Sequence, residues 1–156
     1  MAVVISRLDY CNSVITGLPA DQIAQLRWVQ YNAAWLMTKK GSWVHVTPLF
    51  KELHWLPIKF CCQYKNGTLA YRHFEGSLPL YLSSSLCTYE LSRFLQSSSE
   101  KLLKIPKQNL RSFRQCSFSF MATFIWNSLP STLRNVPTLS QFKPQLKTFL
   151  FTQAFQ

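Results

Sequence analysis

Apolar residues recur at helical spacing through most of the chain. Residues 2–16 carry them four, three and four positions apart, at Val4, Leu8, Cys11 and Ile15. After Gly17 and Pro19 the spacing resumes, at Ile23, Leu26, Val29, Ala33 and Leu36. Gly17 suits a left-handed helix cap, and Pro19 suits a first helical position. The pattern predicts an antiparallel helical hairpin, whose second helix runs from about Pro19 to Lys40 and is stopped by Gly41.

Prolines mark the start of the next helices. Thr47-Pro48 is typical of an N-cap followed by a first helical position, and it predicts a short helix over 48–55. The proline that follows predicts another helix over 58–74, although Asn66-Gly67 within it is a turn dipeptide. Glycine costs about 1 kcal/mol against alanine inside a helix. Either the helix breaks there or packing overrides this cost, and residues 79–86 predict one more short helix.

The pattern changes after this point. Residues 87–100 are rich in serine and predict a linker. Leu102–Ile105 predicts a short strand, paired with another near Ser112–Phe118. Large apolar residues predict a helix over 119–128, and a last amphipathic helix is expected over 139–154.

Together these elements predict a mainly α fold: a small helical domain with room for one short β-hairpin. The chain has 156 residues, of which 47% are apolar, enough to build a core and to exclude a disordered tail. We expect a helical region over 1–86, the linker over 87–100 and a basic extension with its terminal helix over 101–156. Whether these form one compact unit or two weakly coupled parts stays open.

Charge is distributed unevenly along the chain. The net charge is +11, and all six acidic residues lie in residues 1–100 beside nine basic ones. Residues 101–156 hold eight basic residues and no acid. A field of this sign attracts polyanions, most often nucleic acid or an anionic membrane face. The alternative is a solvated basic face without a dedicated partner.

The candidate binding residues lie in this C-terminal part. One group is Lys101, Lys104, Lys107, Arg111 and Arg114, and a second is Lys143 and Lys147 on a strip of the last helix. Pro106 prevents one continuous helix through the first group, which predicts a basic loop and strand edge. Phe113 and Phe118 alternate with these basic residues. They are either a stacking platform for the nucleobases of a single strand or part of the core.

Motifs for chemistry are missing from the sequence. There is no glycine-rich phosphate loop and no Gly-x-Ser-x-Gly elbow, and the histidines do not have metal-ligand spacing with any cysteine. We therefore expect no catalytic residue, no metal and no cofactor. The five cysteines show no framework spacing, so we read them as reduced and mostly buried thiols of an intracellular protein, cytoplasmic or nuclear. No stretch is apolar enough for a membrane span.

Several short sequence boxes follow one another in a fixed order. They are SRLDYCNS at 6–13 with GLP at 17–19, LRWVQYNAAWL at 26–36, TP at 47–48 with LHWLP at 53–57, LPLYL at 78–82, a stretch from Phe118 to Pro130 ending in WNSLP, and a helix from Phe142 to Phe155. In this order they resemble the region that follows the catalytic palm in non-LTR (LINE-type, jockey-like) retrotransposon reverse transcriptases. The resemblance covers nearly the whole chain from Ser6 onward.

The resemblance implies a piece of an RNA-directed DNA polymerase, with thumb-like helices over 1–86 and the C-terminal extension. The fingers and the palm, with the aspartates that hold the catalytic metals, have no counterpart here. We therefore expect a non-catalytic fragment with weak, sequence-independent binding to the RNA or DNA backbone. The missing fingers and palm of the parent polymerase are a second expected partner. The alternatives are a helical protein-interaction module and a decayed reading frame without activity.

Overall fold

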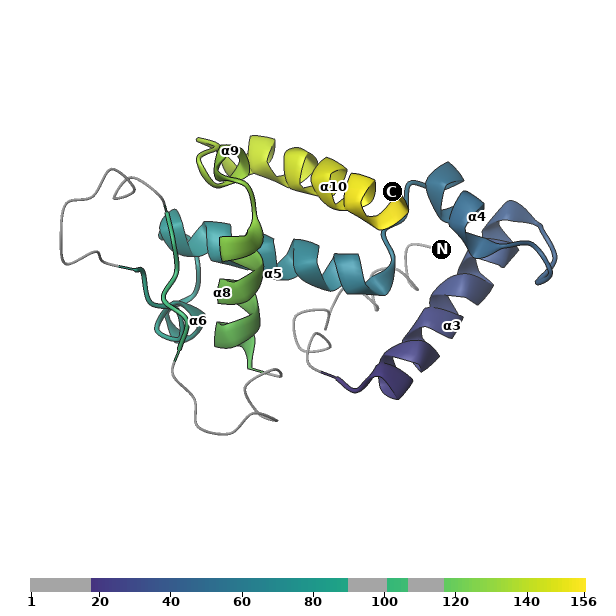
Figure 1. The fold of residues 1–156 in the computed structure, drawn as a ribbon, viewed down its shortest axis with the longest axis horizontal. Helices are drawn as coiled ribbons and strands as arrows, with labels where there is room; N and C mark the ends of the chain where they lie inside the picture. Colours follow the sequence, from purple (N-terminus) through teal and green to yellow (C-terminus); the bar gives the residue numbers. More distant parts are fainter. Residues whose placement is uncertain (1–17, 90–100, 107–116) are drawn as a thin grey trace.

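The computed structural model describes residues 18–89, 101–106 and 117–156, and this part of the chain is mainly helical (Figure 1). Its helices are α3 (Ala20–Thr38), α4 (Val46–Glu52), α5 (Ile58–Phe74), α6 (Leu80–Ser83), α8 (Phe118–Ser128), α9 (Ser131–Arg134) and α10 (Leu139–Phe155). The mainly α fold class is thus confirmed. The helix expected over 2–16 lies outside the described residues. None of the described helices is long and apolar enough to cross a bilayer.

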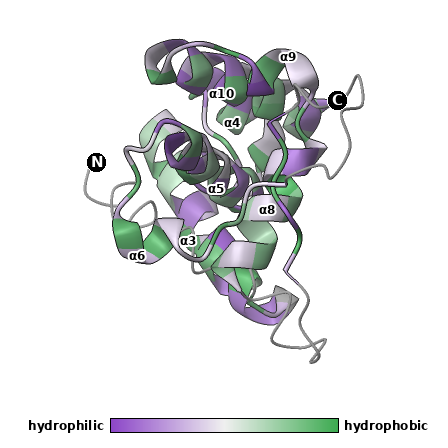
Figure 2. Ribbon diagram, turned by 90° about the vertical axis from the view of Figure 1, so that its left-hand side faces the viewer, coloured by the Kyte–Doolittle hydropathy of each residue, from purple (hydrophilic) through white to green (hydrophobic). Residues whose placement is uncertain are grey.

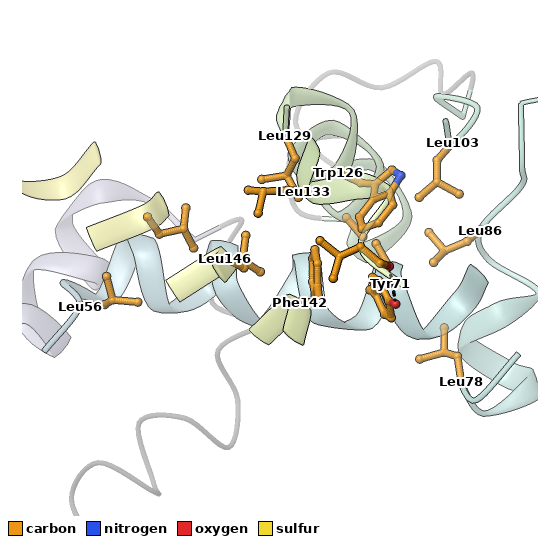
Figure 3. Close-up of a cluster of buried hydrophobic side chains, with 14 residues drawn as sticks. Leu56, Tyr71, Leu78, Leu86, Leu103, Trp126, Leu129, Leu133, Phe142 and Leu146 are labelled. Carbon is orange, nitrogen blue, oxygen red and sulfur yellow. Dashed lines mark hydrogen bonds between the residues drawn. The ribbon is translucent and has the colours of Figure 1, made fainter. Parts of the chain in front are cut away.

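Helix α5 is the centre of the larger core. Helices α8 and α10 both pack against it, and α10 runs along it in Figure 1. The buried side chains come from both sides of the serine-rich segment: Leu56, Ala70, Tyr71, Leu78, Leu86, Leu103, Ala122, Trp126, Leu129, Leu133, Val136, Phe142, Leu146 and Leu150 (Figure 3). Trp126 and Phe142 are fully buried and lie 5.9 Å apart, centroid to centroid.

Helix α5 passes through Asn66-Gly67 without a break. Both residues are buried, and the Asn66 side-chain amide donates to the Cys62 carbonyl one turn earlier, at 3.0 Å. A Cβ on Gly67 would lie 3.1 Å from a methyl carbon of Leu146, tighter than an ordinary van der Waals contact. Glycine therefore allows α10 to approach α5 closely, and packing offsets the helix-propensity cost.

A second, smaller core joins α3 to α4. Ala34, Leu49 and Phe50 are buried there, and Tyr31, Trp35, Val44, Val46, Leu53, Trp55 and Phe155 pack around them. The Trp35 indole N–H donates to the Val44 carbonyl at 3.0 Å, which fixes the loop between the two helices. Phe155 belongs to α10, so the C-terminal helix reaches from the larger core to the smaller one.

A buried amide connects α3 to the start of α5. The Gln30 side chain donates to the Leu56 carbonyl at 2.8 Å and accepts from the Ile58 N–H at 3.2 Å. Both backbone groups flank Pro57, the N-cap of α5, where no helix or sheet pairs them. One side chain thus satisfies two backbone groups and fixes the angle between the two helices.

The helix ends differ from the sequence prediction in detail. Helix α3 ends at Thr38, because Lys39 adopts the left-handed conformation (φ 53°), two residues before the expected stop at Gly41. Helix α4 begins at Val46 and is capped by His45, whose ring nitrogen accepts from the Thr47 N–H, so Thr47 is not the N-cap. The helix also ends at Glu52, earlier than expected. Helix α9 was not predicted, and α6 is shorter than the expected helix over 79–86.

The extended segment around Leu103 pairs with a different partner from the predicted one. Thr88 and Leu103 form an isolated antiparallel bridge, with hydrogen bonds from Tyr89 N–H to the Leu102 carbonyl and from Lys104 N–H to the Cys87 carbonyl. Of the predicted partner strand, Phe118 opens α8. Residues 112–116, like most of the serine-rich segment, lie outside the described residues. No β-sheet forms within the described ranges, so no hairpin is seen there.

We predict that Gln30→Ala lowers the free energy of unfolding by about 1–3 kcal/mol, because it leaves the Ile58 N–H buried without a partner and leaves the Leu56 carbonyl with only the weak Cys61 thiol donor. Urea unfolding followed by circular dichroism measures this loss. Gln25→Ala, at an exposed position of the same helix, is the matched control and should stay within about 0.5 kcal/mol. Equal stability of the two variants would contradict the structural role of Gln30.

Because the Tyr71 phenol is buried, we expect the protein to lose stability at alkaline pH. Burial, and then the neighbouring Glu75 carboxylate, raise the pKa of the Tyr71 phenol, whose hydroxyl donates to the Val136 carbonyl at 2.8 Å. A raised pKa favours the protonated folded state. This contribution is therefore complete below pH about 10, the pKa of an exposed tyrosine, and is lost as pH rises above it.

Urea unfolding of the wild type at several pH values between about 8 and 11 should show this fall in the free energy of unfolding. Tyr71→Phe should flatten the fall. Tyr81→Phe removes an exposed phenol and should leave it in place. A fall of the same size in the Tyr71→Phe protein would show that another group causes it.

Candidate nucleic-acid interface

Four of the seven candidate binding residues lie in the described part of the chain. Lys101 and Lys104 are exposed on the extended segment 101–106, and Lys143 and Lys147 lie on α10. Lys107, Arg111 and Arg114 lie outside the described residues. Phe118 packs against the larger core, which is the second of the two roles weighed for it, and Phe113 is not described.

The segment that carries Lys101 and Lys104 is held by two consecutive residues of α8. The Asn127 side chain accepts from the Leu103 N–H at 3.0 Å and donates to the Leu103 carbonyl at 2.8 Å. The Trp126 indole N–H donates to the Lys101 carbonyl at 2.7 Å. The Leu103 side chain is buried in the core. These bonds fix the backbone between the two lysines while their side chains remain in solvent.

On α10 the two lysines lie one turn apart, beside the buried face of the helix. Phe142 and Leu146 are fully buried, and each is followed directly by a lysine. Lys147 is exposed, and Lys143 is half-buried. Residues at this spacing have Cβ atoms about 6 Å apart, close to the spacing of successive phosphates along a nucleic-acid strand. The strip predicted from the sequence is thus present on the helix.

Trp126 contacts residues that support both lysine pairs. Its N–H binds the carbonyl of Lys101, and its ring lies near that of Phe142, the residue before Lys143. Figure 3 shows Trp126 between Leu103 on one side and Phe142 on the other. The two pairs are therefore attached to one rigid centre made by α8, α5 and α10. The sequence analysis did not identify Trp126 or Asn127 as anchors, although both lie in the WNSLP box.

In the part of the chain that the structure describes, no ion pair offsets the positive charge of these lysines. Within the described residues the one ion pair joins Lys40 to Glu52, at 2.8 Å, and it lies at the end of α3. Residues 101–156 contain no carboxylate side chain at all. Arg134 is buried and so does not add to the exposed charge. Lys101, Lys104 and Lys147 expose their charge to solvent, and exposed positive charge attracts a polyanion through phosphate contacts.

Side chains for chemistry do not gather anywhere in the described part. No three His, Cys, Asp or Glu side chains lie close enough together there to hold a metal ion. The nearest approach to a catalytic pair is His73 Nδ1 with the Ser83 hydroxyl, at 3.0 Å. Partial burial lowers the pKa of His73, so the ring is neutral at physiological pH. Within the described residues no acidic side chain orients this ring, and we assign the pair the structural role of tying α6 to α5.

Comparisons with known proteins leave the family of the chain open. No protein-family model matches the sequence, no curated protein matches it, and no solved structure matches the fold.

Proposed function

We propose that this chain is a non-catalytic, nucleic-acid-binding piece of a retroelement RNA-directed DNA polymerase, as its sequence boxes suggest. Its activity is weak, sequence-independent binding to the backbone of RNA or DNA. The observation that carries the proposal is the pair of lysine sets, Lys101 with Lys104 and Lys143 with Lys147, attached to a rigid centre in a part of the chain, residues 101–156, that has no acidic side chain.

Three physical arguments support this function. The lysines have no carboxylate partner in the described structure, so their charge is available for phosphates. The backbone that carries Lys101 and Lys104 is fixed by Asn127, which reduces the entropy lost when a ligand binds. The third argument is the chemistry of the exposed lysine ammonium groups, which pair with phosphate oxygens. Contacts of this kind position a nucleic acid but do not select its sequence.

The first test compares two double variants with the same change in net charge. Lys143→Glu with Lys147→Glu alters the proposed surface, and Lys59→Glu with Lys65→Glu alters exposed positions of α5. Affinity for a fluorescent 20-base-pair duplex is measured by anisotropy at salt concentrations between 50 and 300 mM. We expect the α10 variant to bind more weakly and to lose about 0.9 from the salt slope for each phosphate contact removed.

The α5 variant controls for net charge alone. The proposal predicts a clear difference between the two double variants at every salt concentration. If both lose the same affinity, binding depends on overall charge and the proposed surface is wrong. If the wild type shows no binding even at the lowest salt, the proposed function itself is wrong.

A second test removes no charge. Asn127→Leu releases the Leu103 backbone from α8 and frees the segment that positions Lys101 and Lys104. We expect faster amide hydrogen exchange at Leu103 and a loss of duplex affinity of several-fold, because the lysines must then be ordered on binding. Ser128→Ala changes the next residue, at an exposed position, and is the control. Unchanged affinity despite faster exchange would show that anchoring does not matter for binding.

A specific observation favours one alternative, the helical protein-interaction module. Helix α6 exposes two large side chains, Leu80 and Tyr81, and Figure 2 shows its hydrophobic residues at the edge of the molecule. Exposed apolar patches mark sites of protein contact. Flat or absent nucleic-acid binding in the salt series would favour this alternative.

A further inference from the structure

Trp43 is the most exposed large hydrophobic side chain in the described part of the chain. It is 88% exposed, in the loop between α3 and α4. Its ring lies against Gly41, where a Cβ would come within 2.2 Å of the six-membered ring. Gly41 therefore does not stop α3 but makes room for this indole. One side of the Trp43 ring contacts the backbone at Gly41, and the rest of its surface is open to solvent.

A second exposed indole is linked to the first through Trp35. Trp28, on α3, is 58% exposed, and its ring lies 6.3 Å from that of Trp35. Trp35 in turn donates its indole N–H to the Val44 carbonyl, directly after Trp43. The backbone carbonyl of Trp35 also accepts hydrogen bonds from the N–H groups that follow α3, at Lys39 and Lys40. Trp35 thus hydrogen-bonds to both ends of the loop between α3 and α4, and its ring packs against one side of the Trp28 ring.

The charges around these rings are mainly positive. Arg27 and Lys39 are exposed next to Trp28 and at the end of α3, and neither has an acidic partner in the described structure. Lys40 is paired with Glu52, and this pair is neutral overall. Exposed indoles beside unpaired cations complement a ligand that has both flat rings and negative charge.

The exposed aliphatic residues of α3 lie on a different part of its surface. Val29 and Leu36 are displaced from Trp28 by about 80–100° around the helix axis, a quarter of a turn. The exposed polar residue Asn32 lies between these directions. Trp28 is therefore flanked by Arg27, Tyr31 and Trp35 and does not form part of one continuous aliphatic patch.

We propose that Trp28 and Trp43 form a stacking surface for the unpaired bases of single-stranded nucleic acid, with Lys39 and Arg27 contacting the phosphates. Indole rings stack on any base, because every base has a π-face, so this site is sequence-independent too. It goes beyond the proposed function, since it lies on α3 and the loop after it and not on α10 or segment 101–106, and it requires bases in addition to phosphates. A duplex, whose bases are already stacked, does not occupy it.

The experiment separates bases from phosphates. The full chain is titrated against a labelled 12-residue oligothymidylate and against an abasic oligomer with the same number of phosphates, both at 100 mM salt, by fluorescence anisotropy. We expect the oligothymidylate to bind about ten-fold more tightly than the abasic strand, and Trp43→Ala to remove this difference. Affinity for the duplex used above should be unchanged in the same variant.

Two further variants control for the loss of an aromatic ring. Tyr81→Ala removes an exposed aromatic residue of α6 and should leave the preference for oligothymidylate intact. Gly41→Ala keeps every aromatic residue but forces the Trp43 ring from its seat, and it should weaken oligothymidylate binding several-fold. Both changes are at surface positions, and circular dichroism checks that the helices persist.

Three results would overturn the proposal. They are equal affinity of the wild type for both strands, no binding of oligothymidylate at all, and unchanged binding in Trp43→Ala. If Trp43→Ala instead abolishes self-association in sedimentation, or binding to anionic vesicles, the surface serves a protein or a membrane and not bases. Failure of the α10 lysine variant to affect duplex binding would concern the proposed function only.

Discussion

The position of Trp126 is the constraint on which most of the described structure depends. Its side chain has no exposed surface, and it contacts Tyr71 and Phe74 of α5 and Phe142 of α10 at centroid distances of 5.2–6.3 Å. An indole this deeply buried needs a partner for its N–H, and the Lys101 carbonyl supplies it. The same residue therefore completes the core and fixes a surface segment, so that packing and the placement of charge cannot vary independently.

Two primary amides play the same part at the irregular points of the chain. Gln30 pairs with both backbone groups around Pro57, and Asn127 pairs with both backbone groups of Leu103. Neither stretch has helical partners, and a buried backbone group without a hydrogen bond is costly. Gln30 lies in the box LRWVQYNAAWL and Asn127 in the box WNSLP. Their structural roles explain why these residue types stand there, whether or not the chain binds a ligand.

The sequence predicted the long helices well, because the periodicity of their apolar residues reflects the face that each buries. The bounds of α5 and α8 and the start of α10 agree with the pattern to within about a residue. Helix ends and loops were predicted less well, since they depend on contacts distant in sequence. Gly41 looked like a helix stop, but it accommodates the Trp43 ring. Leu103 was expected to pair with a later strand, but Asn127 holds it where Thr88 reaches it.

The candidate site shows the same division between what sequence can and cannot reveal. Charge is a property of composition, so the basic character of residues 101–156 was apparent from the sequence. Which basic residues are held in a fixed arrangement depends on tertiary hydrogen bonds. Arg134 adds to the net charge of the sequence, but it is buried in the fold. The exposure of Trp43 was equally hidden, because periodicity distinguishes a core face from a solvent face within helices and strands but not in a loop. Each proposed binding surface therefore depends on the neighbours that fix it: Trp126 and Asn127 for the lysines, and Gly41 and Trp35 for the exposed indoles.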